Sequence, residues 1–194
     1  LGDVYKRQAP NGKIYAIAYN STQILEIDPE THSTTLFGSL SSDGGKWVGG
    51  VLAPNGKIYG IPYYSTQVLE IDPETQNTTL FGNLSSDGAK WAGGVLAPNG
   101  KIYAIPQGST QVLEIDPETQ QTNLFGNLSG TYKWSGGVLA PNGKIYCIPY
   151  NATQVLEIDP ETQQLTLFGS LSGTYKWYGG VLAPNGKIYT IVHS

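Results

Sequence analysis

The chain has 194 residues, a formal net charge of −4 and only 13% charged residues. It lacks a basic patch, and no apolar run approaches the roughly 18 residues of a membrane-spanning helix, so we expect neither a nucleic acid nor a membrane as partner. A single cysteine excludes an internal disulfide and a cysteine-based zinc site, and we expect no metal and no cofactor.

The N-terminal segment, residues 1–8 (LGDVYKRQ), differs from everything that follows it. It precedes the first of several copies of APNGKIY, whereas the later copies are preceded by GGVL. The string DVYKRQ is also the translation of GAT GTG TAT AAG AGA CAG, which resembles the end of a transposase adaptor used in sequencing libraries. We therefore interpret residues 1–8 as a non-native segment that is dispensable for the fold. The alternative is a divergent cap strand of a natural repeat array.

Internal repetition dominates the rest of the chain. APNGKIY begins at positions 9, 53, 97, 140 and 183, so the period is 43 or 44 residues. Periods of this length with strand-like content are typical of propeller blades. We expect about four blade-equivalents, and, if residues 1–8 are non-native, a fragment of a longer repeat protein. The expected units are a partial blade 9–45, blades 46–89, 90–132 and 133–175, and a partial blade 176–194.

Each repeat predicts four short antiparallel strands. In residues 90–130 these are WAGGVLA, KIYAI, TQVLEID and TNLFGNL. The dipeptide Asn99-Gly100 favours a tight hairpin between the first two, and Asp116-Pro117 favours a turn between the last two. KIYAI is apolar on both faces, which indicates a strand between two packed layers. The expected fold is therefore all-β, a β-propeller or an open arc of one, with a β-solenoid or a sandwich as alternatives.

Differences between the copies gather in two kinds of loop. The APNG and DPET turns are invariant, whereas the loops between the second and third strands, and those between blades, vary. In an up-and-down blade these variable loops share one face of the disc. We expect this variable-loop face to carry ligand binding, because loops on a rigid scaffold often carry function. The alternative is neutral drift of the loops.

A Lys-Trp pair opens each strand one, and aromatic residues occupy the variable loops. An exposed indole can stack on a sugar or a base, and a nearby lysine can hold an anionic group. The alternative is that each tryptophan packs between blades. The candidate ligand-binding residues are Lys46, Trp47, Lys90, Trp91, Lys133, Trp134, Lys176, Trp177, Tyr63, Tyr64, Tyr150 and Asn151.

The remaining polar residues do not assemble a catalytic or metal-binding constellation. The aspartates of the IDPET turns are expected to bond their own backbone. The strand-three glutamates are expected to face solvent or to pair with a lysine. His32 belongs to a turn on the invariant face, and Cys147 takes a small-residue packing position. We therefore assign no catalytic residue.

The pattern GGVLAPNGKIY…VLEIDPET…LF resembles the propellers that include NHL repeats, gluconolactonase-like enzymes and streptogramin-lyase-like proteins. The resemblance covers nearly all of residues 9–192 and implies a six- or seven-bladed propeller. In gluconolactonase-like members it implies a divalent metal held by carboxylate and Asn ligands, and in the lyases a histidine with acidic residues. Neither set matches positions of this chain, because His32 lies in a different turn and the carboxylates repeat identically.

The sequence favours a non-catalytic propeller that presents repeated ligand sites for a carbohydrate, peptide or protein on its variable-loop face. One alternative is a fragment of a lactonase- or lyase-like enzyme whose catalytic blades are missing; another is a purely structural array. Missing blades of the same chain are further expected partners. We leave the cellular location open and prefer a secreted or cell-surface one.

Overall fold

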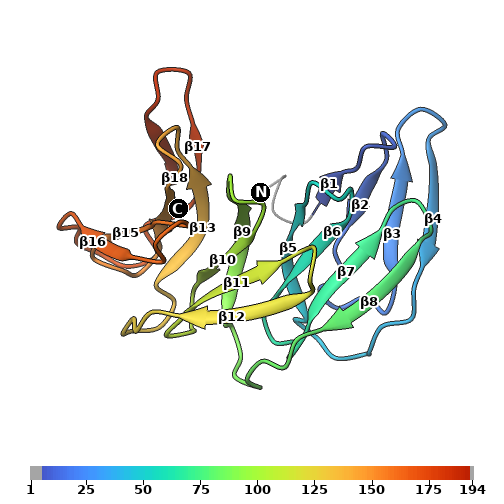
Figure 1. Ribbon diagram of the computed structural model, residues 1–194, viewed down its shortest axis with the longest axis horizontal. Coiled ribbons are helices and arrows are strands. Elements are labelled where there is room, and N and C mark those ends of the chain that lie inside the picture. The colour runs from blue at the N-terminus through green and yellow to red at the C-terminus, as the bar shows by residue number, and fades with distance from the viewer. Residues whose placement is uncertain (1–5, 193–194) are drawn as a thin grey trace.

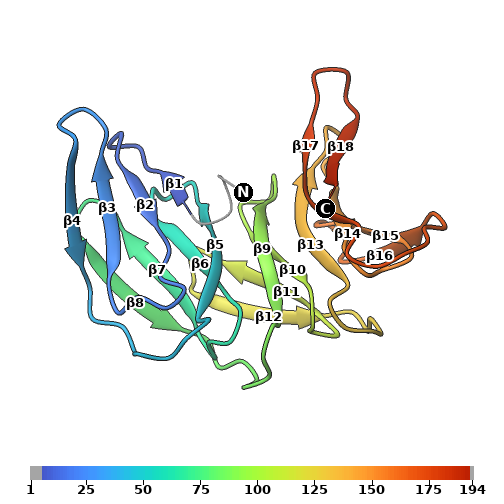
Figure 2. The same cartoon turned by 180° about the vertical axis from the view of Figure 1, so that it is seen from behind.

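The computed structural model describes residues 6–192, which contain eighteen strands. No helix long and apolar enough to cross a membrane occurs in this part of the chain. Four four-stranded antiparallel sheets are followed by one two-stranded sheet. Figure 1 shows the sheets side by side in an arc, with β4 and β16 at its outer sides, and Figure 2 shows the same order from behind.

The strands recur in the same order in every sheet. The first strands are β1 (Lys6–Gln8), β5 (Trp47–Leu52), β9 (Trp91–Leu96), β13 (Trp134–Leu139) and β17 (Trp177–Leu182). The second strands are β2 (Ile14–Ala16), β6 (Ile58–Pro62), β10 (Ile102–Pro106), β14 (Ile145–Pro149) and β18 (Ile188–Val192). The third strands are β3 (Ile24–Asp28), β7 (Val68–Asp72), β11 (Val112–Asp116) and β15 (Val155–Ile158). The fourth strands are β4 (Ser33–Phe37), β8 (Asn77–Phe81), β12 (Gln121–Phe125) and β16 (Leu165–Phe168).

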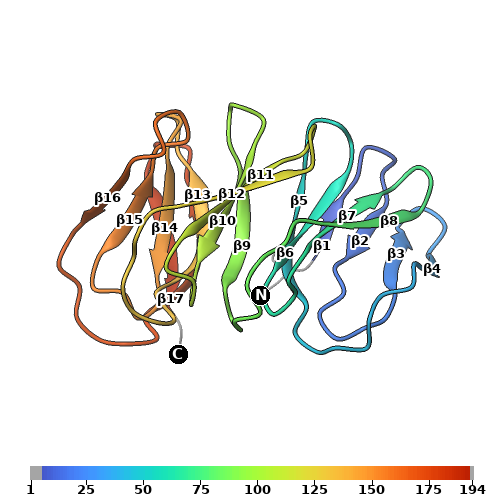
Figure 3. The same cartoon turned by 60° about the horizontal axis from the view of Figure 1, so that its bottom comes forward.

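These sheets confirm the expected all-β blades at the repeat spacing. Strands one of successive blades contact each other, β5 with β9, β9 with β13 and β13 with β17, which is the radial arrangement of a propeller. Figure 3 shows these first strands on the inner side of the neighbouring sheets. In the first blade the place of strand one is taken by Lys6–Gln8, which pairs with β2 over three residues. The interpretation of residues 1–8 as non-native stays a prediction, and residues 1–5 lie outside the described residues.

Strand two is buried on both faces, as its composition predicts. In β10, Ile102, Tyr103, Ala104 and Ile105 are all fully buried. Ile102 and Ala104 pack in the cluster shared with the preceding blade, whereas Tyr103 and Ile105 pack in the cluster shared with the following blade. Each strand two therefore lies between two layers of apolar side chains, and this burial of apolar surface holds the stack of blades together.

A carboxylate lies within this packing in each of the first three blades. In the second blade, Glu70 is 4% exposed and accepts hydrogen bonds from Lys57 Nζ at 2.7 Å and Tyr59 Oη at 3.0 Å. The pairing with lysine is confirmed, whereas the alternative of a solvent-facing glutamate is wrong for Glu26, Glu70 and Glu114, because the next blade covers the strand.

The next blade completes this cluster. Gln120, in the DPET turn of blade three, donates from Nε2 to Glu70 Oε2 at 3.0 Å. Asn55 of the second blade donates to Tyr59 Oη at 3.0 Å and to the carbonyl oxygen of Pro117 at 3.3 Å. Burial alone would raise the pKa of Glu70, but the hydrogen bonds from Lys57, Gln120 and Tyr59 outweigh it and leave that pKa below its ordinary value. The invariant turns thus join one blade to the next.

The turn aspartates have the structural role that the sequence predicts. Asp116 Oδ1 accepts backbone hydrogen bonds from Glu118 at 3.0 Å and Thr119 at 3.2 Å. Gln120 then adopts a left-handed conformation with φ of 55°, which directs the chain into β12. His32 takes the equivalent place in the first blade with φ of 56°.

Strand one has a β-bulge that includes the first glycine of the invariant Gly-Gly pair. Trp91 pairs with Pro106 and Gly94 with Ala104, so Ala92 and Gly93 together oppose Ile105. Gly93 has φ of +79°, and a Cβ atom on Gly94 would lie 2.7 Å from Ile61 Cδ1. Both glycines are therefore required, one by its backbone conformation and one by the close approach of the neighbouring blade.

The tryptophan at the start of strand one is a packing residue. Trp91 is 1% exposed, and its Nε1 donates to the carbonyl oxygen of Gln111 at 2.9 Å. Trp47 and Trp134 make the equivalent bonds to Gln67 and Gln154. The indole thus links strand one to the start of strand three inside the blade.

We expect Glu70→Ala to lower the free energy of unfolding by about 2–3 kcal/mol, because Tyr59 and Gln120 lose a charged acceptor inside the protein. Glu157→Ala is the matched control. Glu157 bonds Lys144 but is 17% exposed and has no glutamine donor from a following turn within residues 6–192. Glu157→Ala should lower the free energy of unfolding by about 1 kcal/mol or less. Chemical denaturation measures both variants. Equal losses in the two variants would contradict the role of the inter-blade contact.

We expect Trp91→Phe to lower the free energy of unfolding by about 2 kcal/mol, because it leaves a void and an unpaired carbonyl at Gln111. Trp177→Phe should cost less, since Trp177 is half-buried in the two-stranded sheet. Thermal and chemical denaturation of both variants measures this. An unchanged stability of Trp91→Phe would show that the ring is not a packing residue.

Candidate functional site

The variable loops form a continuous backbone ladder on one face. The amide of Lys90 donates to the carbonyl of Tyr63 at 3.0 Å, and the carbonyl of Lys90 accepts from the amide of Gln107 at 2.9 Å. Lys46 and Lys133 make the same two kinds of bond in their blades. The backbone thus fixes the first residue of each loop after strand two, while its side chain remains free to differ between blades.

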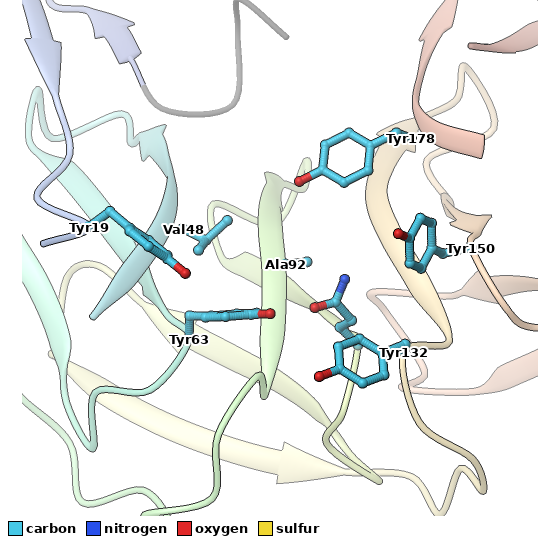
Figure 4. Close-up of a pocket in the computed structure, with 8 residues that line it drawn as sticks. Tyr19, Val48, Tyr63, Ala92, Tyr132, Tyr150 and Tyr178 are labelled. Atoms are coloured by element: carbon cyan, nitrogen blue, oxygen red, sulfur yellow. The ribbon is translucent and has the colours of Figure 1, made fainter. Parts of the chain in front are cut away.

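These fixed positions converge on a pocket of about 270 Å³. Its lining residues come from all five blades and from one inter-blade loop: Tyr19, Val48, Tyr63, Ala92, Gln107, Tyr132, Tyr150 and Tyr178. Figure 4 shows Tyr19 and Tyr63 on one side of the pocket, with Tyr132, Tyr150 and Tyr178 on the other. We call it the axial pocket, because its floor is made by the innermost strands.

Three tyrosines of the axial pocket point their hydroxyl groups into it. In Figure 4 the hydroxyl oxygens of Tyr19 and Tyr63 point from one side toward the space above Ala92, and that of Tyr178 points toward it from the other. The ring of Tyr150 packs edge-on against Tyr178, with centroids 6.2 Å apart, which steadies that side of the pocket. The site is therefore a ring of neutral donors and acceptors.

Burial raises the pKa of two of these phenols, Tyr63 and Tyr150. It raises the pKa of Tyr63 to about 12, with smaller contributions from the neighbouring phenols of Tyr64 and Tyr132. Valine, alanine, glutamine and tyrosine make up the whole lining, and none of them carries a charge at neutral pH. The pocket thus offers hydrogen bonds to a ligand but no charged partner.

The β-bulge of strand one positions the floor of the pocket. The residue after each tryptophan belongs to the bulge, which turns its side chain toward the axis. This position is occupied by Val48, Ala92, Ser135 and Tyr178, and it is the variable place in the otherwise constant motif KWxGGVL. All but Ser135 line the axial pocket. Sequence reasoning missed these residues, although their variation between copies could have revealed them.

The Lys-Trp pairs have a different location from the one expected. Lys46, Lys90 and Lys133 are 1–3% exposed, and so are Trp47, Trp91 and Trp134. Lys133 Nζ donates to the carbonyl oxygens of Ser109 at 2.8 Å and Gly130 at 2.9 Å, and burial lowers its pKa to about 8. These residues hold the loops in place. Their burial corrects the expectation that the tryptophan rings are open to stack on a ligand. Lys176 and Trp177, in the last sheet, are half-buried.

Three of the expected residues line a second, smaller pocket of about 260 Å³ in blade four. Lys133, Trp134 and Asn151 lie there between the loops 129–131 and 151–154. Asn151 Oδ1 also accepts a hydrogen bond from the amide of Tyr175 at 2.8 Å, which is a structural role. Trp134 contributes little surface to this pocket, because it is 3% exposed.

Among the expected loop tyrosines, Tyr63 and Tyr150 line the axial pocket, and Tyr64 does not. Tyr64 packs edge-on against Tyr63, with centroids 5.0 Å apart, and covers Gly45 and Gly88. Tyr19, Gln107, Tyr132 and Tyr178 were missed as site residues. Three of them lie in the loops whose variation pointed to this face.

Other reactive groups lie away from the axial pocket. Cys147 is fully buried, and burial raises the pKa of its thiol. His32 is exposed in a DPET turn, and His193 lies outside the described residues. Within the described part of the chain, no three His, Cys, Asp or Glu side chains come together as a metal-binding group.

Comparison with known proteins shows the fold of the chain. Neither a family model nor a curated protein sequence matches it. Virginiamycin B lyase from Staphylococcus aureus superimposes with a TM-score of 0.77 at 10% identity, over 97% of this chain and 69% of the lyase chain. A catalytically inactive histidine-to-alanine variant of that lyase, solved with quinupristin, superimposes with a TM-score of 0.78 at 12% identity. The match covers 96% of this chain and 69% of the lyase chain.

A further similar structure is the extracellular domain of a two component system from B. thetaiotaomicron. It has a TM-score of 0.72 at 14% identity and covers 97% of this chain and 26% of that one. At these identities the comparisons show the fold alone. They confirm the resemblance to streptogramin-lyase-like propellers, and the chain is a β-propeller repeat protein.

Proposed function

We propose that this chain is a non-catalytic, ligand-binding propeller that holds a neutral, hydroxyl-rich ligand, a carbohydrate, in the axial pocket. The observation that carries the proposal is the convergence of five tyrosine side chains from different blades and loops on one space. Their hydroxyl groups can each donate and accept a hydrogen bond, as the hydroxyl groups of a sugar do.

The size and chemistry of the pocket support a small uncharged ligand. A volume of about 270 Å³ lies at the lower end of typical small-molecule sites. A charged ligand would lose its hydration and find no opposite charge in the lining, which is costly. The lysines closest to the loops do not provide a charged partner for a ligand, because their ammonium groups already donate to backbone carbonyls.

This proposal changes the expected number of sites. Four equivalent Lys-Trp sites would give binding by multivalency. The described residues instead bring unequal side chains from several blades to one place on the axis. We therefore propose one asymmetric site there, with a peptide ligand as the alternative that the experiment below also covers.

A second candidate function is an enzyme of the lyase type, and the similar structures favour it. The catalytically inactive variant of that lyase carries a histidine-to-alanine substitution. In this chain the tyrosines would have to serve as acids or bases, and burial raises the pKa of Tyr63 to about 12. Such a phenol remains protonated at neutral pH and is a poor base there, so we place binding first.

We expect Tyr63→Phe and Tyr150→Phe each to weaken carbohydrate binding about tenfold, because each removes one hydroxyl and keeps the ring. Tyr189→Phe is the control: Tyr189 is 52% exposed and bonds Asn185 of the invariant turn. A glycan array and a peptide array identify ligands, and calorimetric titration compares the variants. Binding that survives both pocket substitutions, or that occurs with peptides alone, would contradict the proposal.

A further inference from the structure

The repeat is broken at one position of the axial pocket. The repeat position four residues after the strand-two tyrosine is Tyr19, Tyr63 and Tyr150 in three blades, but Gln107 in blade three. Ala92, the smallest of the bulge residues, belongs to the same blade and lines the same pocket. Blade three therefore carries a smaller side chain at each of these two positions, and at one of them a different polar group.

The backbone of Gln107 is held from both sides. Its amide donates to the carbonyl of Lys90 at 2.9 Å, and its carbonyl accepts from the amide of Lys133 at 2.9 Å and from Lys133 Nζ at 3.2 Å. The neighbouring Gly108 allows close approach of the loop, since a Cβ atom there would lie 2.7 Å from the carbonyl oxygen of Ala89. The side chain thus starts from a fixed point.

The side-chain amide of Gln107 is nearly enclosed, but it has no partner among the described residues. The residue is 6% exposed and lines the axial pocket. Its side-chain oxygen and nitrogen make no hydrogen bond with any other residue of the described chain, and neither atom is fully cut off from the pocket. A buried amide without partners costs free energy unless something in the pocket bonds it.

We propose that Gln107 is the specificity-determining residue of the axial pocket and binds two adjacent hydroxyl groups of a neutral pyranose. The inference rests on the proposed function. A primary amide has an acceptor oxygen beside a donor nitrogen. Neighbouring equatorial hydroxyl groups match it, because one donates to the oxygen while the other accepts from the nitrogen. The surrounding tyrosine hydroxyls then bond the remaining hydroxyl groups of the sugar.

The proposal accounts for the departure from the repeat. A tyrosine at this position would fill the space and offer a single hydroxyl group. Glutamine leaves room for the sugar ring and supplies a paired donor and acceptor. Discrimination follows, because a ligand that lacks either hydroxyl leaves one amide atom unpaired in an enclosed site.

The test compares three variants by calorimetric titration with methyl pyranosides of glucose, galactose and mannose. Gln107→Leu should weaken binding of the best ligand about tenfold. Gln107→Tyr, which restores the residue of the other blades, should abolish it by filling the pocket. Gln121→Leu, the same change on the exposed strand β12, should have no effect. All three should keep the parent's thermal midpoint.

Monodeoxy derivatives of the best-binding sugar complete the test. Removing either of two adjacent hydroxyl groups from the sugar should weaken its binding to the parent protein about tenfold. The same deoxy sugars should bind Gln107→Leu as well as the intact sugar does, because the variant already lacks the hydrogen bonds that these hydroxyl groups make. Unchanged binding by Gln107→Leu, with binding still lost in Tyr63→Phe, would overturn this inference and leave the proposed function standing. A parent protein that binds none of the three sugars would overturn both.

Discussion

The buried carboxylate on strand three is the interaction on which the arrangement of the blades depends. Strand two lies between two sheets, so a charged group beside it must find all its partners within the protein. Glu70 finds them in Lys57 and Tyr59 of its own blade and in Gln120 of the next. The same set recurs around Glu26 and Glu114. Each blade thus depends on the turn of its neighbour.

This dependence explains why one face of the propeller does not vary between copies. In the APNG turn, the asparagine bonds the buried tyrosine and the next blade, and in the DPET turn, the aspartate bonds its own backbone. Substitution of either would leave polar groups unpaired. On the opposite face, backbone bonds and the buried lysines fix the loops, and the side chains that line the pocket differ between copies without loss of the fold. The axial pocket is built from those side chains.

The sequence predicts the fold well, because its signals are local and repeated. The Asn-Gly and Asp-Pro turns bracket strands whose burial follows from their composition, and strand two is buried on both faces as expected. The Lys-Trp pairs were harder to interpret. A tryptophan beside a loop can stack on a ligand or pack between strands. The burial of Trp91 and its bond to Gln111 distinguish these cases. The partners of Lys133 are backbone carbonyls, which no residue pattern reveals.

The pocket itself depends on features that strand prediction cannot supply. The alternation of side chains along strand one does not reveal the bulge at Gly93. Because of this bulge, Ala92 faces the axial pocket. Tyr132 reaches the pocket from a loop between blades, where register is not defined by pairing. Comparison of the copies nevertheless contained the signal, since the pocket is lined at positions where the copies differ. In a repeat protein, those positions should be examined first.

The central claim is that the invariant face is structural and the variable-loop face binds the ligand. Chemical-shift mapping by ¹H–¹⁵N NMR during titration with a neutral methyl pyranoside tests it most directly. We expect the shifts to concentrate at the amides of Tyr19, Tyr63, Gln107 and Tyr150, which line the axial pocket, and the amides of the APNG and DPET turns to remain unchanged. Shifts concentrated at those turns, or spread evenly over the blades, would contradict the account.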